Sequence, residues 1–473
     1  MFERLRNMLL PKVRTVFRQV KARFDAAQTT SDNARHWSAA DYYSADEEAR
    51  PEIRRTLRIR SRYEVANNSY ARGLVQMLAN DAIGSGPRLQ MLGEDEGLND
   101  RIEAAFAQWC EAVRLPQKLR LMRVARCQDG EAFAVMFDNP GLHSRVKLDL
   151  AVVEADRIQG ESLWGEDENE HDGIRYDGWG NPVSYRVLKR HPGDSRSMPG
   201  DDAVTVPAEY MLHIYRQDRP GLHRGIPELT AALPLFAQLR RYNLAVLSAA
   251  EAAADFAAVL YTDSPPDGET ESLAPMDTIP LERNMMVTMP AGWKMGQLDS
   301  KQPTSSHAEF VKVILSEIAR CVCSTYGSVA GDFSGFNYAS GRLDAQIYQK
   351  SILVDRSFWE TEALNAILRQ WLREYSLLHP ELDLDADAMA HCWFWDAFVH
   401  VDPVKEATAQ QMRLANNTTT LAAECAKEGR DYLSVLRQRA KELRLMRELG
   451  IPIAVNGNQV PDRDDTRENR ENE

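Results

Sequence analysis

Residues 210–260 combine a strand, a chain break and a long helix, and they read YMLHIYRQDRPGLHRGIPELTAALPLFAQLRRYNLAVLSAAEAAADFAAVL. The short apolar run at 211–215 predicts a β-strand. Turn-forming residues follow at Pro220–Gly221 and between Gly225 and Pro227. From Phe236 to Leu260 there is neither glycine nor proline. This absence predicts one continuous helix, about 38 Å long at 1.5 Å per residue.

The predicted helix has no single apolar stripe, and its second half is nearly all alanine. Such a helix requires protein on most of its sides, and its small side chains let neighbouring backbones approach closely. Taken alone, this pattern is typical of a buried helix in the core of a large domain.

Three segments carry a resemblance to a known family. They occur in the order RPGLHRGIPEL at 219–229, GDFSGFNYASGR at 331–342 and WFWDAFVHVDPVKEA at 393–407. On these segments the chain resembles the lambda-type phage portal proteins, the head–tail connectors, and a weaker similarity reaches upstream to Arg58. The matching positions are Arg219, Pro220, Gly221, Arg224, Gly225, Pro227, Gly331, Asp332, Asn337, Tyr338, Arg342, Asp402 and Pro403. Ala339 and Gly341 replace serines of the family pattern, which leaves the side-chain contacts of the second motif open.

Composition narrows the classes of function. The 473 residues are enough for about three domains. A net charge of −13 argues against a protein that grips nucleic acid, because phosphate binding depends on Lys and Arg. A surface past which DNA slides is compatible with that charge, since net repulsion keeps the duplex from adhering. The six cysteines form no CxxC pair and are expected to be reduced, and no long apolar run predicts a membrane span, so the cytoplasm is the expected compartment.

Helical patterns dominate the first third of the chain. The basic amphipathic segment 1–24 is compatible with a membrane-surface helix or with a docking arm, and a polar linker follows at 29–35. Further helices are expected over 46–83, 98–109 and 119–127. On the first of them, Arg58, Arg60 and Arg62 form either a solvated face paired with acids or a patch that contacts nucleic acid.

Strand patterns dominate residues 130–217. The apolar run 130–137 predicts a buried strand, and shorter strands are expected at 147–153, 173–176, 183–187 and 211–215. The acidic segment 160–172 predicts a mobile loop. Together these residues are expected to form a β-rich module.

The second half of the chain is again mostly helical. A break at 263–268 precedes a predicted hairpin of residues 285–289 and 293–295. Helices are expected over 306–326, 343–378, 404–416, 418–426 and 431–449. Pro403 is expected to open one of these helices with Asp402 as its cap. The charged tail from residue 456 predicts disorder.

The resemblance implies a mixed α+β, mostly α-helical portal fold with wing, stem, clip and crown. It assigns 1–45 to an N-terminal arm and linker, 46–227 to the wing with its β-rich module at 130–217, 228–260 to a stem helix, 261–304 to the clip, 305–326 to the second stem helix, 327–340 to the tunnel loop, 341–400 to a long helix and the junction of wing and crown, 401–455 to crown helices and 456–473 to the tail.

Residues 327–340 are rich in glycine and aromatic side chains, among them Gly327, Phe333, Gly335 and Phe336. A phosphate-binding loop is not expected, because the GxxxxGK[ST] pattern is missing and the chain has no Gly-Lys pair. An ordinary surface loop is one interpretation. The resemblance implies another, a tunnel loop that projects toward a central channel, and the mobility that glycine permits suits a loop past which a duplex moves.

No catalytic constellation, cofactor site or metal site is predicted. The sequence contains no GxSxG, HExxH or Walker motif. The alternating Asp383, Asp385 and Asp387 lack the glycine and the glutamate of a calcium loop. A structural role rather than zinc binding is expected for His379, His391, Cys392, His400 and Asp402.

The leading hypothesis, implied by the resemblance, is a structural subunit that assembles with itself into a ring, a dodecamer, at one capsid vertex. The ring would belong to the virion and would assemble in the host cytoplasm. Double-stranded DNA would pass through its channel without sequence specificity during packaging and ejection. The implied partners are the terminase large subunit, which would hydrolyse the ATP, the major capsid or scaffold protein and a head–tail adaptor. No membrane partner and no enzymatic activity are expected.

Two acids on the long helix, Glu251 and Asp255, lie one turn apart and share a face. If that face lines the channel, the carboxylates repel phosphates, and if it faces outward they are merely solvated. The alternative function is a DNA-processing enzyme or nuclease subunit, which would need clustered carboxylates that hold a divalent metal.

Overall fold

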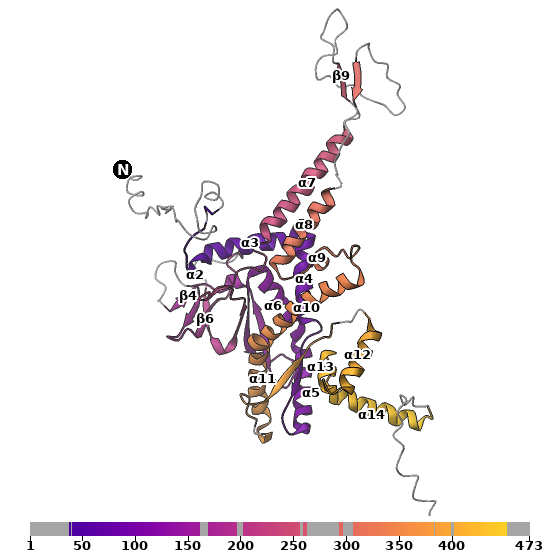
Figure 1. Ribbon diagram of the computed structural model, residues 1–473. Coiled ribbons are helices and arrows are strands. Elements are labelled where there is room, and N and C mark those ends of the chain that lie inside the picture. The colour runs from indigo at the N-terminus through magenta and orange to yellow at the C-terminus, as the bar shows by residue number, and fades with distance from the viewer. Residues whose placement is uncertain are drawn as a thin grey trace, which may run out of the picture.

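The computed structural model describes residues 37–38, 40–160, 169–195, 202–255, 259–262, 293–296, 306–382, 384–398 and 402–451. In Figure 1 a body of helices and small sheets carries a stem made of α7 (Leu233–Asp255) and α8 (Ser306–Cys321), with β9 (Val259–Thr262) beyond its far end. The predicted mixed, mostly helical fold is confirmed. Predictions for the N-terminal arm, for most of the segment 261–304 and for the tail lie outside the described residues.

The first helical segment is divided into α2 (Ala45–Glu48), α3 (Pro51–Asn67) and α4 (Ser69–Ile83). The prediction of one helix over 46–83 is therefore wrong. Pro51 occupies the first turn of α3, where its missing N–H costs nothing. Asn68 interrupts the helix because its side chain accepts from the backbone N–H groups of Tyr70 and Ala71 and starts α4.

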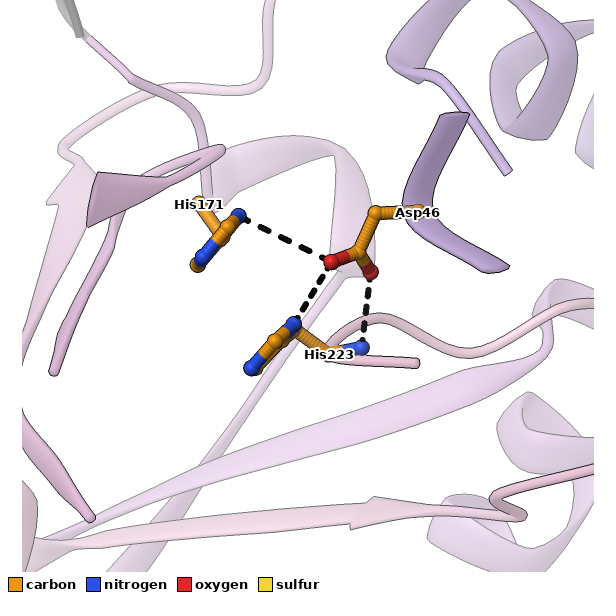
Figure 2. Close-up of side chains that lie close together, drawn as sticks. All are labelled: Asp46, His171 and His223. Carbon is orange, nitrogen blue, oxygen red and sulfur yellow. Dashed lines mark hydrogen bonds and ion pairs between the residues drawn. The ribbon is translucent and has the colours of Figure 1, made fainter. Parts of the chain in front are cut away.

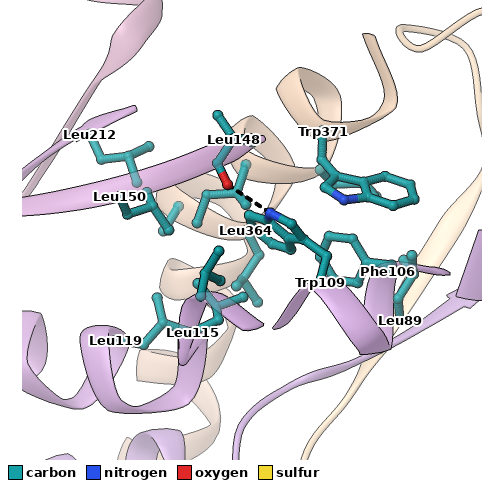
Figure 3. Packing of buried hydrophobic residues seen from close by; sticks show 14 of the residues in the cluster. Leu89, Phe106, Trp109, Leu115, Leu119, Leu148, Leu150, Leu212, Leu364 and Trp371 are labelled. Atoms are coloured by element: carbon teal, nitrogen blue, oxygen red, sulfur yellow. Dashed lines mark hydrogen bonds between the residues drawn. The ribbon is translucent and has the colours of Figure 1, made fainter. Parts of the chain in front are cut away.

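Helices α5 (Glu96–Val113) and α6 (Leu115–Asp129) confirm the two predicted next and extend them at both ends. Trp109 on α5 donates its indole N–H to the carbonyl of Leu148 at 2.8 Å, which satisfies a polar group inside the largest apolar core. Figure 3 shows Trp109, Phe106 and Trp371 packed together there. This core joins the helices to the three-stranded sheet described next.

The described residues of the β-rich module form two antiparallel sheets. One has the order β3-β2-β8, from β2 (Glu131–Asp138), β3 (Leu148–Val153) and β8 (Met211–Tyr215). The other has the order β4-β5-β6-β7, from β4 (Glu170–His171), β5 (Ile174–Tyr176), β6 (Pro182–Leu188) and β7 (Ala203–Pro207). All five predicted strands of the module are found, whereas β4 and β7 were not predicted. The prediction of a mobile loop over 160–172 is wrong at its end, because His171 pairs with Ile174.

The stem helix α7 ends at Asp255, so the prediction that it continues to Leu260 is wrong. Residues 259–262 instead form β9, which pairs antiparallel with β10 (Trp293–Gly296). The backbone pairing overrides the helix pattern, since propensity is a weak guide when a partner strand is available. The strand expected at 285–289 lies outside the described residues.

The return helix α8 ends at Cys321, five residues before the predicted end at residue 326. Cys323 has φ +54°, and the N–H of Ser324 donates to the carbonyl of Ala319 at 2.9 Å. These two features form a helix-terminating motif of the Schellman type. Thr325 then starts the short helix α9 (Tyr326–Ala330).

A long helix follows, made of α10 (Tyr338–Trp359), a π-helical turn η4 (Glu360–Leu364) and α11 (Asn365–Leu378). It begins at Tyr338 rather than at the predicted Leu343, because Asn337 and Ser340 form a capping box. The predicted loop 327–340 is thus helical at both ends. The predicted stop at His379–Pro380 is confirmed.

The last part of the chain contains β11 (His391–Phe394), which pairs with β1 (Arg88–Met91), and three further helices. These are α12 (Pro403–Ala415), α13 (Leu421–Lys427) and α14 (Tyr432–Glu448), close to their predicted bounds. Asp402 caps α12 by accepting from the N–H of Lys405 at 3.2 Å, as predicted. Among the described residues, no helix is both long and apolar enough to cross a membrane.

Candidate functional site

The segment 219–229 connects β8 to the stem helix α7 and passes over the start of β2. Its two arginines lie in different environments: Arg219 is exposed and pairs with Glu48 of α2, whereas Arg224 is 1% exposed. Between them, Pro220 and Gly221 form a turn in which Gly221 has φ +80°, a value that glycine adopts without strain.

Arg224 forms a bidentate ion pair with Glu131, the first residue of β2. Its Nε lies 2.9 Å from Oε2 and its Nη2 lies 2.7 Å from Oε1. The backbone N–H of Gly225 donates to the same carboxylate at 3.1 Å. Arg58 and His213 complete the surroundings of Glu131, each at 3.2 Å. The segment 219–229 is thereby fixed to both α3 and the three-stranded sheet.

The protonation of Glu131 follows from this arrangement. Burial by itself would raise the pKa of the carboxyl group, but Arg224 and His213 outweigh burial and hold the pKa well below its usual value. Glu131 is therefore ionised at neutral pH, and its negative charge is neutralised by the ion pair with Arg224.

Two glycines allow the backbone of this segment to lie directly on the sheet. A Cβ at Gly225 would lie 2.1 Å from the carbonyl oxygen of Gly130, and a Cβ at Gly130 would lie 2.4 Å from the carbonyl carbon of Ile226. Gly130 also has φ +94°. Both positions therefore require glycine. Pro227 continues the segment toward α7 and accepts the hydroxyl of Thr230 at its carbonyl.

A second buried network lies where the segment meets α6 and α10. Glu228 accepts from Arg123 at 3.1 Å and from Arg126 at 2.9 Å. The same two arginines donate to Asp355 of α10 at 2.7 and 2.6 Å. These four charges connect the base of the stem to the long helix, and they neutralise one another pairwise.

The pKa of Glu228 makes this network sensitive to acid. Burial would raise that pKa, but Arg123 and Arg126 outweigh burial and lower it to about 2. A lowered carboxyl pKa stabilises the fold above the unfolded value of about 4.3, and the stabilisation disappears as the pH falls toward 2. We expect this group to remove roughly 3 kcal/mol of unfolding free energy between about pH 4.5 and pH 2. Urea unfolding at a series of pH values measures the slope, which should be smaller in Glu228→Gln, and an unchanged slope would contradict the assignment.

The three arginines predicted on α3 do not share one solvated face. Arg58 is buried between Glu131 and Asp156, and Arg62 donates to Asp129 at 2.8 Å, whereas Arg60 is exposed. The pairing with acids is confirmed for Arg58 and Arg62, and the solvated face is wrong for Arg58. The partners come from distant parts of the chain, so the helical pattern alone could not show that the charged side is the buried one.

The second motif surrounds a short exposed turn. Gly327 is buried in α9, where a Cβ would lie 2.9 Å from the ring of Phe333, and Gly331 ends that helix with φ +65°. Asp332 accepts from the N–H of Ser334 at 3.0 Å. Phe333 is 61% exposed with its ring 5.8 Å from that of Phe336, and Gly335 has open space around it. The non-helical part of the predicted loop is therefore confined to residues 331–337.

The structure brings the second and third motifs together. The ammonium group of Lys405 lies 5.2 Å from the ring centre of Tyr338 and 2.8 Å from the carboxylate of Asp402. Asn337 and Asp402 cap helices α10 and α12, and Pro403 is the first residue of α12. Arg342 is exposed on the first turns of α10.

A family model described as "Phage portal protein, lambda family" matches residues 30–356 of this sequence. The chain belongs to the lambda family of phage portal proteins. It is 25% identical over 428 residues to a probable portal protein of Halomonas phage phiHAP-1, an alignment that covers 84% of this chain and 82% of that one.

The chain is also similar to solved structures from gene transfer agent particles. The neck of an empty particle, computed with C6 symmetry, is 14% identical with a TM-score of 0.47 and covers 78% of this chain and 92% of its own. The neck of a native particle, computed with C12 symmetry, is 15% identical with a TM-score of 0.44 and covers 80% and 94%.

The two acids expected to face the channel lie near the far end of the portal stem helix. Glu251 is exposed, and Asp255 is the last residue of α7, with its side chain outside the described residues. Their position on one face of α7 remains a prediction, as does the channel-facing role of that face.

The buried acids of both networks were not predicted from the sequence. Glu131 had a visible signal, because a carboxylate at the start of the apolar run 132–137 is typical of a buried ion pair. The cluster of Asp46, His171 and His223, whose ligand atoms all lie within 4.8 Å of one another, was not predicted either. These residues come from three segments that are far apart in the chain, and no sequence spacing could have joined them.

Proposed function

We propose that this portal-family chain is a subunit of a closed ring, a dodecamer, at one capsid vertex of the virion. Double-stranded DNA would pass through the central channel during packaging and ejection. The proposed role is structural rather than catalytic. The observation that carries this proposal is that a single copy of the chain exposes apolar side chains to solvent, both at its stem and on α10.

The first bare surface lies at the base of the stem, and we call it the stem-base patch. It consists of Leu244 and Leu247 on α7, which are 58% and 55% exposed, and of Ile59 and Tyr63 on α3. Arg240 joins the two helices, because it pairs with Glu64 at 2.5 Å and lies over the ring of Tyr63. Exposed apolar side chains that gather on one surface are typical of a protein interface.

The second bare surface is one face of α10, which we call the α10 face. Leu343, Ile347 and Val354 are 61%, 61% and 67% exposed, and their spacing places them on one side of the helix. The stem-base patch and the α10 face are formed by different elements. An interface between two different surfaces forms a ring when its rotation closes around an axis.

The charges of the chain favour a channel through which DNA passes rather than a surface that binds DNA tightly. The net charge of −13 repels a duplex and keeps it from adhering. The buried arginines that could bind phosphate are already matched to acids, as Arg224 is to Glu131 and Arg126 is to Glu228. These matched pairs also weigh against a nuclease, since the acids are held by arginine rather than presented to a divalent metal.

The partners follow from the proposed position of the ring. The end of the stem beyond β9 would dock the terminase large subunit during packaging, with ATP hydrolysis belonging to that partner, and a head–tail adaptor afterwards. The body would contact the major capsid or scaffold protein, and assembly would take place in the host cytoplasm.

Sedimentation velocity of the purified chain tests this proposal. The expected result is a discrete particle of a single large mass that persists on dilution. A mass equal to that of one chain at every concentration would exclude the ring.

A further inference from the structure

Three segments of the wing meet at two histidines and one carboxylate. Asp46 comes from α2, His171 from β4 and His223 from the segment 219–229. Oδ2 of Asp46 lies 2.7 Å from Nδ1 of His223 and 3.8 Å from Nδ1 of His171. Figure 2 shows both rings stacked side by side with these nitrogens turned toward the same carboxylate, and the ring centres are 4.2 Å apart with an angle of 4° between the planes.

The carboxylate is oriented by a separate hydrogen bond. The backbone N–H of His223 donates to Oδ1 of Asp46 at 3.0 Å, which turns Oδ2 toward the two imidazoles. A hydrogen bond of this kind, which holds one oxygen of a ligating carboxylate, is characteristic of the surroundings of protein metal sites.

The backbone that carries both histidines is fixed by buried charges. Asp172 and Gly173 form the tight turn after His171, with φ +45° and +84°. The carboxylate of Asp172 is held by Arg54 and, at 3.0 Å, by Arg224. Arg224 directly follows His223 and is fully buried against Glu131. The backbone on which both histidines lie is thus held by the same ion network.

We propose that Asp46, His171 and His223 bind a divalent transition metal, for which Zn²⁺ is the best fit. The site has two nitrogen ligands and one oxygen ligand, the set found in many zinc sites that leave one position to water. Ligand distances of about 2.0–2.1 Å in a tetrahedral site place the ligand atoms roughly 3.3–3.5 Å apart. The separations of 2.7 and 3.8 Å between Asp46 and the two imidazole nitrogens bracket that range. The two rings, which are stacked at 4° to each other, would turn about their side-chain bonds to aim both nitrogens at one ion.

The cluster is open to solvent. The side chains of His171, Asp46 and His223 are 38%, 31% and 28% exposed, which leaves the site accessible to an ion from solvent.

A metal here would fasten the start of the wing to the family motif. Helix α2 has four residues, and its described apolar contacts are confined to a small cluster of Ala45, Ala49, Leu222 and Ile226. A metal bound at Asp46 would connect α2 to β4 and to the segment 219–229 at one point. The inference rests on these contacts alone and stands whether or not the chain forms a ring.

The test uses the full-length chain with Cys323→Ser, which removes the exposed thiol that would compete for zinc. The metal-stripped protein is dialysed against Zn²⁺ and then against Mg²⁺, and bound metal is measured by mass spectrometry. We expect one Zn²⁺ per chain and no Mg²⁺, because hard cations prefer oxygen ligands. Co²⁺ should give the visible absorption of a site with nitrogen ligands, and bound Zn²⁺ should raise the Tm.

Three variants locate the site. His171→Ala and Asp46→Asn should each weaken Zn²⁺ binding by on the order of 100-fold or more, since even changes around the ligands cost about 10–100-fold. His143→Ala, which changes an exposed histidine of the same module, should bind like the parent. Asp46→Asn keeps the size of the side chain and an acceptor for the N–H of His223, so it controls for misfolding. Binding of less than about one tenth of an ion per chain, or equal binding by the three variants, would overturn the proposal.

Discussion

Replacing Arg224 by methionine is expected to lower the free energy of unfolding by about 3–5 kcal/mol, the range for removing one partner of a buried ion pair. Arg224 is 1% exposed and Glu131 is fully buried, so the variant leaves a carboxylate inside the protein without its bidentate partner. Methionine retains much of the apolar volume, which separates the effect of charge from that of a cavity. Urea unfolding followed by tryptophan fluorescence measures the loss.

Arg219 provides the matched control for this prediction. It is an arginine of the same segment, but its ion pair with Glu48 is about half exposed on both sides. Exposed pairs of this kind contribute about 0.2–1 kcal/mol, so Arg219→Met should change the stability little. Similar losses in the two variants would show that the buried network around Glu131 is not what fixes the segment.

Introducing glutamates at Leu244 and Leu247 is expected to abolish the ring while leaving the subunit folded. Both side chains belong to the stem-base patch, which the proposed interface would cover. An unpaired buried charge costs about 3–5 kcal/mol, which corresponds to a weakening of each subunit contact by roughly 100-fold or more. Sedimentation velocity should show single chains at concentrations where the parent forms rings, with an unchanged circular dichroism spectrum.

The far end of α11 offers a control with the same chemistry. Leu377 and Leu378, the last two residues of α11, are 81% and 48% exposed. Helix α11 lies on the side of the body remote from the stem in Figure 1. The variant Leu377→Glu/Leu378→Glu adds the same charge and should still assemble. Rings formed by the stem variant as readily as by the control would place the interface elsewhere.

The sequence predicted most of the helices and strands because their apolar patterns are local. Its errors lie where a local interaction competes with that pattern. Asn68 and Asn337 start helices with their side chains, so one helix was predicted too long and another too short. The end of the stem helix was missed because residues 259–262 pair with β10, which is a contact at long range.

The candidate site was less predictable than the fold. Family resemblance pointed to Arg219 and Arg224 alike. Because both are arginines of the same motif, the sequence could not show that Arg224 is buried against Glu131 whereas Arg219 is exposed. The histidine cluster was out of reach for the same reason, since Asp46 and His223 are 177 residues apart in the chain. Contacts of this kind depend on how the segments are folded together.

Electron cryomicroscopy of the purified full-length chain, averaged without imposed symmetry, tests the ring most directly. The expected images show closed rings of one size, with the stems side by side around a channel wide enough for duplex DNA. The stem-base patch of each subunit should be covered by its neighbour. Single chains at high concentration, or open helical filaments, would contradict the proposed ring.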